Sequence, residues 1–269
     1  MSRYKSILSG LAAVSINAVI LTGMFSSSAV AAPFFIGLGD LPGGIFDSAA
    51  YSISADGSTV VGISQSANGG EAFRWTQSGG LTGLGNLGSS SNLSFATAVS
   101  ADGSVVVGTS NSIHGQEAFR WTQSGGMVGL GDLSGGAFAS GAQGVSVDGN
   151  VIVGEARSAD GSEAFRWTQS GGMVGLGDLP GGGFGSTANA VSADGTVTAG
   201  TGSTALGARG YLHTDADGMV ALTGVNFQSR ANATSADGSV VVGLTNSGAG
   251  QQAFRWSDAD GYARRKRAA

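Results

Sequence analysis

Carboxylates are the side chains of this chain most able to do chemistry, because two cooperating acids could hydrolyse a glycosidic bond. Most of them recur at fixed steps, however, and an active site breaks such symmetry. The acids that do not recur, Asp47, Glu155 and Asp160, are not part of any recognisable motif. We therefore expect turn or ion-pair roles for the repeated acids, and no catalytic residue. The repeated acids lie in Asp-Gly pairs (Asp56, Asp102, Asp148, Asp194, Asp237) or after Gly-Leu-Gly (Asp40, Asp132, Asp178).

Other catalytic and metal-binding patterns are weak or absent in the sequence. His114 and His213 are the only histidines, and they lie too far apart along the chain to suggest a zinc site or a triad. The segments Asp215-Ala-Asp217-Gly and Asp258-Ala-Asp260-Gly look like the start of a calcium loop without its further ligands. No nucleophile elbow or phosphate loop occurs. We predict no metal site, no cofactor-binding residue and no cofactor, and hence no enzyme.

Arginine and tryptophan recur together in the phrase Phe-Arg-Trp. We expect each arginine to pair with a nearby carboxylate, such as the Asp of the following strand, although an arginine in every repeat could also anchor a ligand. We expect each tryptophan to pack against a neighbouring repeat, although exposed indoles could stack on sugars in a multivalent lectin. These residues are Arg74, Arg120, Arg166 and Arg255, with Trp75, Trp121, Trp167 and Trp256.

A period of 46 residues organises these side chains. Glu-Ala-Phe-Arg-Trp-Thr-Gln-Ser-Gly-Gly begins at Glu71, Glu117 and Glu163, and degenerate copies begin at Arg209 and Gln252. Each repeat holds four short segments bounded by Gly, Asp or Ser, and these are 96–100, 104–110, 117–122 and 127–130 in the second repeat. Four strands in this length are typical of one β-propeller blade. The sequence predicts an all-β fold.

The phase of the repeat predicts how the propeller closes. Residues 35–40 read as a fourth strand with no repeat before it, four full repeats follow, and the last repeat supplies three strands. We expect five four-stranded blades, with the N-terminal strand completing the last one and removing exposed sheet edges. A β-solenoid with two coils per repeat and a fragment of a larger ring are the alternatives.

Composition and the chain ends bear on location. Residues 1–31 read as a signal peptide, with Arg3 and Lys5, an apolar run and Ala29-Val30-Ala31; an uncleaved anchor is the alternative. We assign 32–261 to the repeat domain and 262–269 to a basic tail. The chain has no Cys, hence no disulfides, and the repeat domain holds 7 of the 13 basic residues and all 18 acidic ones. This balance argues against nucleic acid. We expect an exported monomer with no membrane span after signal removal.

Three phrases recur in order through the chain: Gly-Leu-Gly-Asp-Leu-Pro-Gly-Gly, Val-Ser-Ala-Asp-Gly-Ser-Val-Val-Val-Gly and Ala-Phe-Arg-Trp-Thr. Together they resemble the bacterial extracellular repeat family that is named for its His-Ala-Phe triplet (HAF repeats). The resemblance covers residues 36–256 and implies a secreted or cell-surface repeat protein without catalytic residues. The chain departs from the family at the His position, which holds Glu71, Glu117, Glu163, Arg209 and Gln252.

The segments that fail to repeat are the best candidates for function. They are the loops 64–70, 110–116, 156–162, 202–208 and 245–251, and the connections between repeats, such as 42–49 and 88–95. Variable loops on a rigid scaffold usually form a binding face, although neutral drift would leave the same pattern. We predict a non-enzymatic module that binds an extracellular glycan or protein. The alternatives are a polysaccharide-active glycosidase and a purely structural envelope or matrix protein.

Overall fold

The computed structural model describes residues 35–90, 92–224, 228–247 and 250–257, which form strands and turns without a helix. The predicted signal peptide and the basic tail lie outside these residues. The chain divides into two compact units, Met1–Gly37 and Leu38–Ala269, and every described strand belongs to the second unit. No helix among the described residues is long and apolar enough to cross a membrane.

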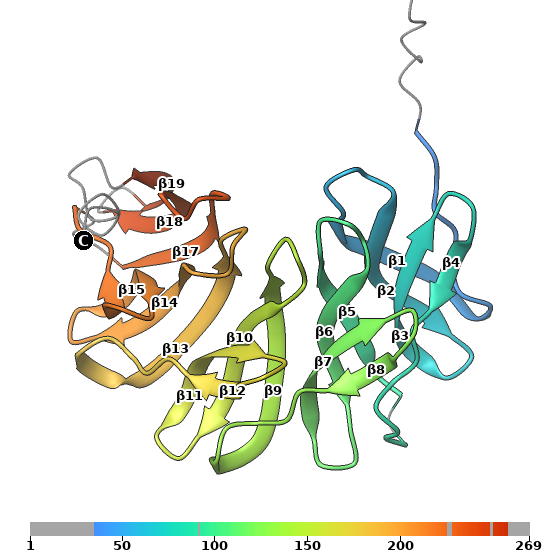
Figure 1. Ribbon diagram of the computed structural model, residues 1–269, viewed down its shortest axis with the longest axis horizontal. Coiled ribbons are helices and arrows are strands. Elements are labelled where there is room, and N and C mark those ends of the chain that lie inside the picture. Colours follow the sequence, from blue (N-terminus) through green and yellow to red (C-terminus); the bar gives the residue numbers. More distant parts are fainter. Residues whose placement is uncertain (1–34, 91, 225–227, 248–249, 258–269) are drawn as a thin grey trace, which may run out of the picture. The chain divides into compact units, whose positions relative to one another are not determined.

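The strands group into five repeats, each an antiparallel meander in chain order (Figure 1). Repeats 1 to 4 have four strands, and the described part of repeat 5 has three. Repeat 1 is β1 (Gly43–Ile53), β2 (Thr59–Ser66), β3 (Gly69–Thr76) and β4 (Gly80–Gly83), and repeat 2 is β5 (Ser94–Val99), β6 (Val105–Asn111), β7 (Gln116–Thr122) and β8 (Gly126–Gly129). Repeat 3 is β9 (Gly135–Val145), β10 (Val151–Ser158), β11 (Gly161–Thr168) and β12 (Gly172–Gly175). Repeat 4 is β13 (Gly181–Val191), β14 (Thr198–Thr204), β15 (Gly207–Thr214) and β16 (Gly218–Ala221), and repeat 5 is β17 (Ser229–Thr234), β18 (Val240–Ser247) and β19 (Gly250–Ser257).

Short-range polar bonds build the turn between the first two strands of each repeat. In repeat 2, the Ser100 hydroxyl donates to Asp102 Oδ1 at 2.6 Å, and the same carboxylate oxygen accepts the Ser104 N–H at 3.0 Å. Gly103 follows with φ +70, a conformation that favours glycine. The turn carboxylates of the other repeats make the same bonds, so the expected turn role of these acids is confirmed.

The hydrophobic core lies between neighbouring repeats rather than inside each one. Four clusters occur, and each joins two successive repeats. The cluster between repeats 1 and 2, for example, packs Val61 and Ala72 against Ala96 and Phe119. The aromatic residue in the third strand is fully buried in repeats 1 to 4, at Phe73, Phe119, Phe165 and Tyr211. Each repeat therefore depends on its neighbours for burial of apolar surface, as repeat architectures require.

Hydrogen bonds also connect successive repeats at corresponding positions. The N–H of Ala55 donates to the carbonyl of Ala101 at 3.0 Å, and the next step runs from Ala101 to Val147 at 3.2 Å. The series continues through Ala193 to Ala236. Single parallel bridges between β7 and β9 and between β11 and β13 join repeats 2 to 4 into one continuous sheet. These contacts fix the 46-residue period as a spatial step from one repeat to the next.

The predicted closing strand at residues 35–40 is not formed, and this part of the closure prediction differs from the structure. The segment has no strand pairing, and Phe35 is fully exposed. The end of the segment and the residue after it nevertheless bond to repeat 1. The Ser48 hydroxyl donates to the Gly39 carbonyl at 2.8 Å, and Leu41 N–H donates to Ser64 Oγ at 3.0 Å. A fourth strand here needs β19 as its partner, and within the described residues β19 pairs with β18 alone.

Candidate functional site

The variable segments lie together at one end of the strands, which we call the loop end. There the connection entering each repeat bonds to the hairpin between its second and third strands. Asn111 N–H donates to the Leu93 carbonyl at 2.8 Å in repeat 2, and Asn246 N–H donates to the Gln228 carbonyl at 2.8 Å in repeat 5. The Asp-Gly and Gly-Gly turns form the opposite end, since the strands are antiparallel. The predicted grouping of the two variable loop classes is therefore present in the structure.

A cavity recurs at this loop end at equivalent positions in the repeat. One copy, of about 280 Å³, lies between repeats 2 and 3, and another, of about 270 Å³, lies between repeats 4 and 5. The first is lined by Gln116 and, from repeat 3, Ala139, Gly141, Glu155 and Arg157, among others. The second is lined by their counterparts Ala208, Gln228, Arg230, Leu244 and Asn246, together with Ser229, Thr245 and Gln251. Two cavities at equivalent positions of the repeat are thus lined by chemically different side chains.

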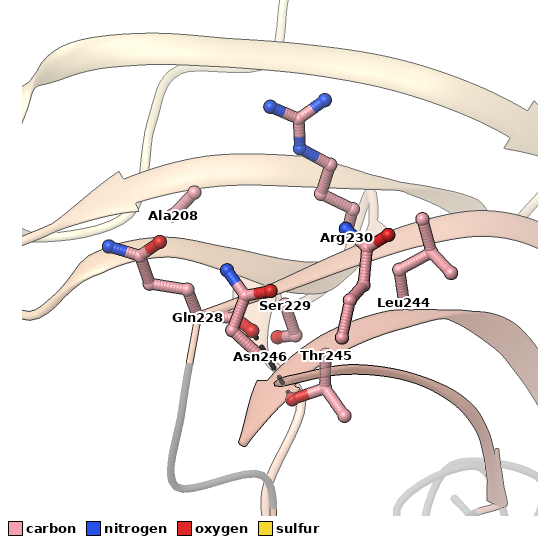
Figure 2. Close-up of a pocket in the computed structure, with 8 residues that line it drawn as sticks. Ala208, Gln228, Ser229, Arg230, Leu244, Thr245 and Asn246 are labelled. Carbon is pink, nitrogen blue, oxygen red and sulfur yellow. Dashed lines mark hydrogen bonds between the residues drawn. The ribbon is translucent and has the colours of Figure 1, made fainter. Parts of the chain in front are cut away.

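The cavity between repeats 4 and 5 is rimmed by exposed polar side chains. Figure 2 shows Arg230 and Asn246 on the same side of the paired strands β17 and β18, with Thr245 on the other side. This arrangement follows from strand alternation and from the pairing of Arg230 with Leu244. The Thr245 hydroxyl donates to the Gln228 carbonyl at 3.2 Å, and this bond ties the two strands at the rim. Amide and guanidinium groups are therefore free to face a ligand from a fixed backbone.

Arg230 also lines an adjacent cavity of about 290 Å³ against repeat 4. Thr187, Asn189 and Thr201 are among the residues that line it. Thr201 Oγ1 is buried and has no hydrogen-bond partner, whereas Asn189 donates to the Ala231 carbonyl at 2.7 Å. An unpartnered buried hydroxyl is costly unless something else supplies the bond. Arg230 therefore stands between two polar hollows on the loop end.

The acids considered for catalysis do not come together as a pair. Asp47 is exposed on β1 in repeat 1, whereas Glu155 and Asp160 belong to repeat 3. Asp160 lies in the hairpin between β10 and β11, and Glu155 lies along β10. The Glu155 carboxylate accepts hydrogen bonds from the Ser162 and Thr187 hydroxyls, the latter at 2.9 Å and from the next repeat. Glu155 thus serves as a bridge between repeats.

The acids after Gly-Leu-Gly and the glutamates that begin the repeated phrase have backbone partners. Asp178 accepts the N–H groups of Gly185 and Ser203, each at 2.8 Å. Glu117 Oε1 accepts the Gly131 N–H at 3.0 Å, and Glu71 and Glu163 make the same bond in their repeats. These carboxylates hold loops in place. The glutamates of the repeated phrase therefore have a structural role.

Arg74 and Arg166 bond to uncharged groups rather than to the predicted carboxylate. Arg74 donates to the Gly103 carbonyl at 3.4 Å and to Thr59 Oγ1 at 3.2 Å, and Arg166 reaches the Gly195 carbonyl at 3.5 Å. Both carbonyls belong to the Asp-Gly turn of the next repeat. A carbonyl partner satisfies the guanidinium without a charged pair, and the Asp that we expected to pair is already engaged by backbone N–H groups.

The tryptophans pack as predicted where a cluster includes them. Trp167 is buried in the core between repeats 2 and 3, Trp121 packs on the cluster of repeats 1 and 2, and Trp256 packs on that of repeats 4 and 5. Trp75 is half-buried.

The other residues considered from the sequence do not form a metal site in the part of the chain that the structure describes. Burial lowers the pKa of His213, and no group of three or more metal-ligating side chains occurs among the described residues. The variable loops named from the sequence contain the cavity residues Gln116, Arg157, Asn246 and Gln251. Arg230 was not singled out from the sequence, although its repeat position otherwise holds uncharged residues.

Comparison with known proteins places the fold. No protein-family model matches the chain, and no curated protein matches it. Solved structures do match. Putative TolB from Agrobacterium tumefaciens aligns with a TM-score of 0.56 at 14% identity, over 78% of this chain and 76% of the other. TolB from Acinetobacter baumannii aligns with a TM-score of 0.52 at 14% identity, over 78% and 52%. The protein has a β-propeller fold.

A prolyl endopeptidase structure is also similar, with a TM-score of 0.53 at 13% identity over 79% of this chain and 35% of the other. The chain spans about half the length of the Acinetobacter protein and about a third of the endopeptidase. At these identities the likeness extends to the fold alone. Propellers of this kind occur both in a catalytic protein and in TolB, so the fold leaves function to be argued from the loop end.

Proposed function

We propose that this protein is an exported, non-enzymatic β-propeller that binds an extracellular partner, in the first place a glycan, through its loop end. One observation carries the proposal: a polar cavity recurs at equivalent loop-end positions of two repeat interfaces, with a different lining each time. The scaffold around these cavities is repeated, while their walls are not. These cavities are therefore where the non-repeated residues would contact a ligand.

The distribution of acids supports binding over catalysis. A glycosidase needs two carboxylates flanking one bond, roughly 5 to 10 Å apart. The repeated acids instead accept bonds from turn hydroxyls and loop N–H groups. Asp47 and Glu155 belong to repeats that are not adjacent, and Glu155 already accepts two hydroxyl bonds. The polar amides and hydroxyls at the loop end suit recognition of sugar hydroxyls.

Export to the cell surface, kinship with HAF repeat proteins and the monomeric state belong to the same proposal. Their support is the apolar N-terminal stretch with its small-residue cleavage signature, and the recurring phrases of the repeat. The acidic balance of the repeat domain supports a partner other than nucleic acid. Mass spectrometry of the exported protein tests the leader directly: we expect the mature N-terminus near residue 32.

We further propose that the ring closes as five blades, with residues 35–40 as the outer strand of repeat 5. At every other interface a third-strand N–H donates to a serine hydroxyl of the next repeat, for example Ala72 to Ser94 at 2.9 Å. The corresponding residues at the two ends are Ala253 and Ser48, and both are exposed. Exposed apolar side chains on β1 accompany them, with Phe46 87% and Ile45 73% exposed. Closure would bury this surface as the four existing clusters do.

A glycan array with the purified protein tests the binding proposal, with an assay for new reducing ends run on every glycan that binds. We expect at least one class of glycan to bind and no bond to be cleaved. Cleavage that survives Asp47→Asn, Glu155→Gln and Asp160→Asn would remove these acids as catalysts but still make the protein an enzyme. An empty array, together with no partner pulled from a cell-envelope extract, would favour a structural role.

A further inference from the structure

We infer that the cavity between repeats 4 and 5 is a site for an acidic saccharide, in which the Arg230 guanidinium receives a sugar carboxylate. This inference rests on the proposed glycan-binding function and names its ligand class. Arg230 is exposed, lines two neighbouring cavities, and makes no ion pair within the part of the chain that the structure describes. An arginine fork binds a carboxylate through two parallel hydrogen bonds, which gives both charge and direction to recognition.

The equivalent cavity between repeats 2 and 3 shows how specific this arrangement is. There the position of Arg230 is held by Gly141, and the position of Leu244 is held by Glu155. A carboxylate thus projects into the wall of one cavity and is replaced by an apolar side chain in the other. The arginine also lies on a different strand in the two cavities. Arg157 is on β10, the second strand of repeat 3, whereas Arg230 is on β17, the first strand of repeat 5. Of two cavities of nearly equal size, only the one between repeats 4 and 5 lacks an acid among its lining residues.

Acidic residues are absent from several sequence segments around this cavity, not only from the position of Leu244. The sequence segments 200–210, 222–232 and 243–253 contain no Asp or Glu and contain two arginines, Arg209 and Arg230. Arg209 stands where the first three repeats have Glu71, Glu117 and Glu163, and Gly224 stands where others have Asp. Asp194, Asp215 and Asp217 of repeat 4 belong to its turns at the opposite end of the strands. Asp178 lies at the loop end, where its carboxylate accepts the N–H groups of Gly185 and Ser203, and it does not line this cavity. Among the residues that line the cavity between repeats 4 and 5, Arg230 is the one charged side chain.

The neighbours of Arg230 suit a saccharide rather than a bare anion. Gln228, Asn246 and Gln251 line the same cavity and are exposed, so their amides can both donate to and accept from sugar hydroxyls. Asn232 is exposed and lines the adjoining cavity beside Arg230. A carboxylate on Arg230 would thus orient a sugar ring whose hydroxyls meet side-chain amides in both cavities. Uronic acid units have this combination of groups.

The test is isothermal titration of the purified full chain with a hexamer of galacturonic acid, a neutral hexasaccharide of the same length, and inorganic phosphate. We expect the acidic hexamer to bind at least tenfold more tightly than the neutral one, and phosphate not to compete at tenfold excess. Arg230→Gln should weaken binding of the hexamer at least tenfold. Arg255→Gln is the matched control, because it removes the same charge from an exposed position of repeat 5 that lines neither cavity, and it should change affinity less than twofold.

A second variant guards against loss of binding through misfolding. Leu244→Glu gives this cavity the acid that repeat 3 carries at Glu155, and it should abolish binding of the hexamer while the melting temperature stays within a few degrees of the wild type. Equal binding of acidic and neutral hexamers, unaffected by Arg230→Gln, would overturn the inference and leave glycan binding intact. Competition by phosphate would overturn the saccharide part. No binding of any glycan would count against the proposed function itself.

Discussion

The Ala72 N–H donates to the Ser94 hydroxyl at 2.9 Å, and this bond links the third strand of repeat 1 to the first strand of repeat 2. The Ser94 hydroxyl in turn donates to the Gly85 carbonyl at 2.6 Å. One serine thus fastens a strand and a loop of the preceding repeat. The same bond recurs at the next three interfaces (Ala118 with Ser140, Ala164 with Ser186, Gly210 with Ser229). The equivalent residues at the two ends of the series are Ala253 in repeat 5 and Ser48 in repeat 1, and they would be partners in a closed ring.

A cysteine pair at the two ends tests ring closure. Ser48→Cys with Ala253→Cys should form an intramolecular disulfide in the otherwise cysteine-free chain, because closure would bring these positions together as it does Ala72 and Ser94. Non-reducing gel electrophoresis with thiol counting measures the bond. Ala72→Cys with Ser94→Cys is the positive control. A double variant whose thiols stay free while the control pair oxidises would contradict five-bladed closure, and a dimer would indicate pairing between copies.

The Asp-Gly turns predict how stability depends on acid. Hydrogen bonds from Ser100 and from the Ser104 N–H hold the pKa of Asp102 down to about 2, and serine bonds do the same for Asp56 and Asp237. A lowered folded-state pKa stabilises the fold fully above the unfolded pKa near 3.8, and this stabilisation is lost as pH falls toward 2. We expect the melting temperature to fall steadily between pH 4 and pH 2.

Asp102→Asn isolates one turn within that acid dependence. The amide oxygen can still accept the Ser104 N–H but does not titrate, so the variant should be less stable at pH 7 and lose less stability on acidification. Melting curves at pH 7, 4 and 2 measure the difference. Parallel curves for the variant and the wild type would show that the turn carboxylate makes no pH-dependent contribution.

The glycine that follows the apolar triplet of each second strand should be irreplaceable. A Cβ at Gly108 would meet the Phe95 carbonyl oxygen, and it would lie 2.9 Å from Ala96 Cα, so backbone would have to move. We expect Gly108→Ala to lower the free energy of unfolding by about 1 to 3 kcal/mol, as overpacking does. Gly183→Ala is the control, since nothing lies within 4 Å of its added Cβ. Urea unfolding of both variants decides, and equal midpoints would refute the close approach.

The glutamate of the repeated phrase should act through its oxygen rather than its charge. Glu117 Oε1 accepts the Gly131 N–H at 3.0 Å, and an amide oxygen can do the same. We expect Glu117→Gln to cost less than about 1 kcal/mol of unfolding free energy, and Glu117→Ala about 1 to 3 kcal/mol because the N–H loses its partner. Urea unfolding measures both. If Glu117→Gln were as damaging as Glu117→Ala, the charge itself would be required.

Local sequence patterns predicted most of the strands correctly. The predictions that differ from the structure concern residues whose partners lie far away in the sequence. Segments 104–110 and 117–122 became β6 and β7 within one residue at each bound, because apolar alternation and Gly turns act over a few residues. The partner of Arg74 is a carbonyl 29 residues further on, in a turn whose closeness depends on how repeats stack. The strand expected at residues 35–40 depends in the same way on β19, from the far end of the chain.

The candidate site was foreseen in part. Variation among repeats marked the loop end, and the structure places both variable loop classes there. The sequence did not show that Arg230 and Leu244 face one cavity, because that requires the register between β17 and β18. Comparing Arg230 with Ala49, Phe95, Gly141 and Thr187 at the same repeat position would have singled it out, since a charge there breaks an otherwise uncharged column.

Hydrogen–deuterium exchange of the full chain, with and without the galacturonic acid hexamer, tests the central claim that binding resides in the non-repeated loop end of repeats 4 and 5. We predict slower exchange in peptides that cover 200–210 and 243–253, and unchanged exchange in peptides that cover the Asp-Gly turns at 54–58 and 100–104. Slower exchange confined to those turns, or no change anywhere in the chain, would contradict it.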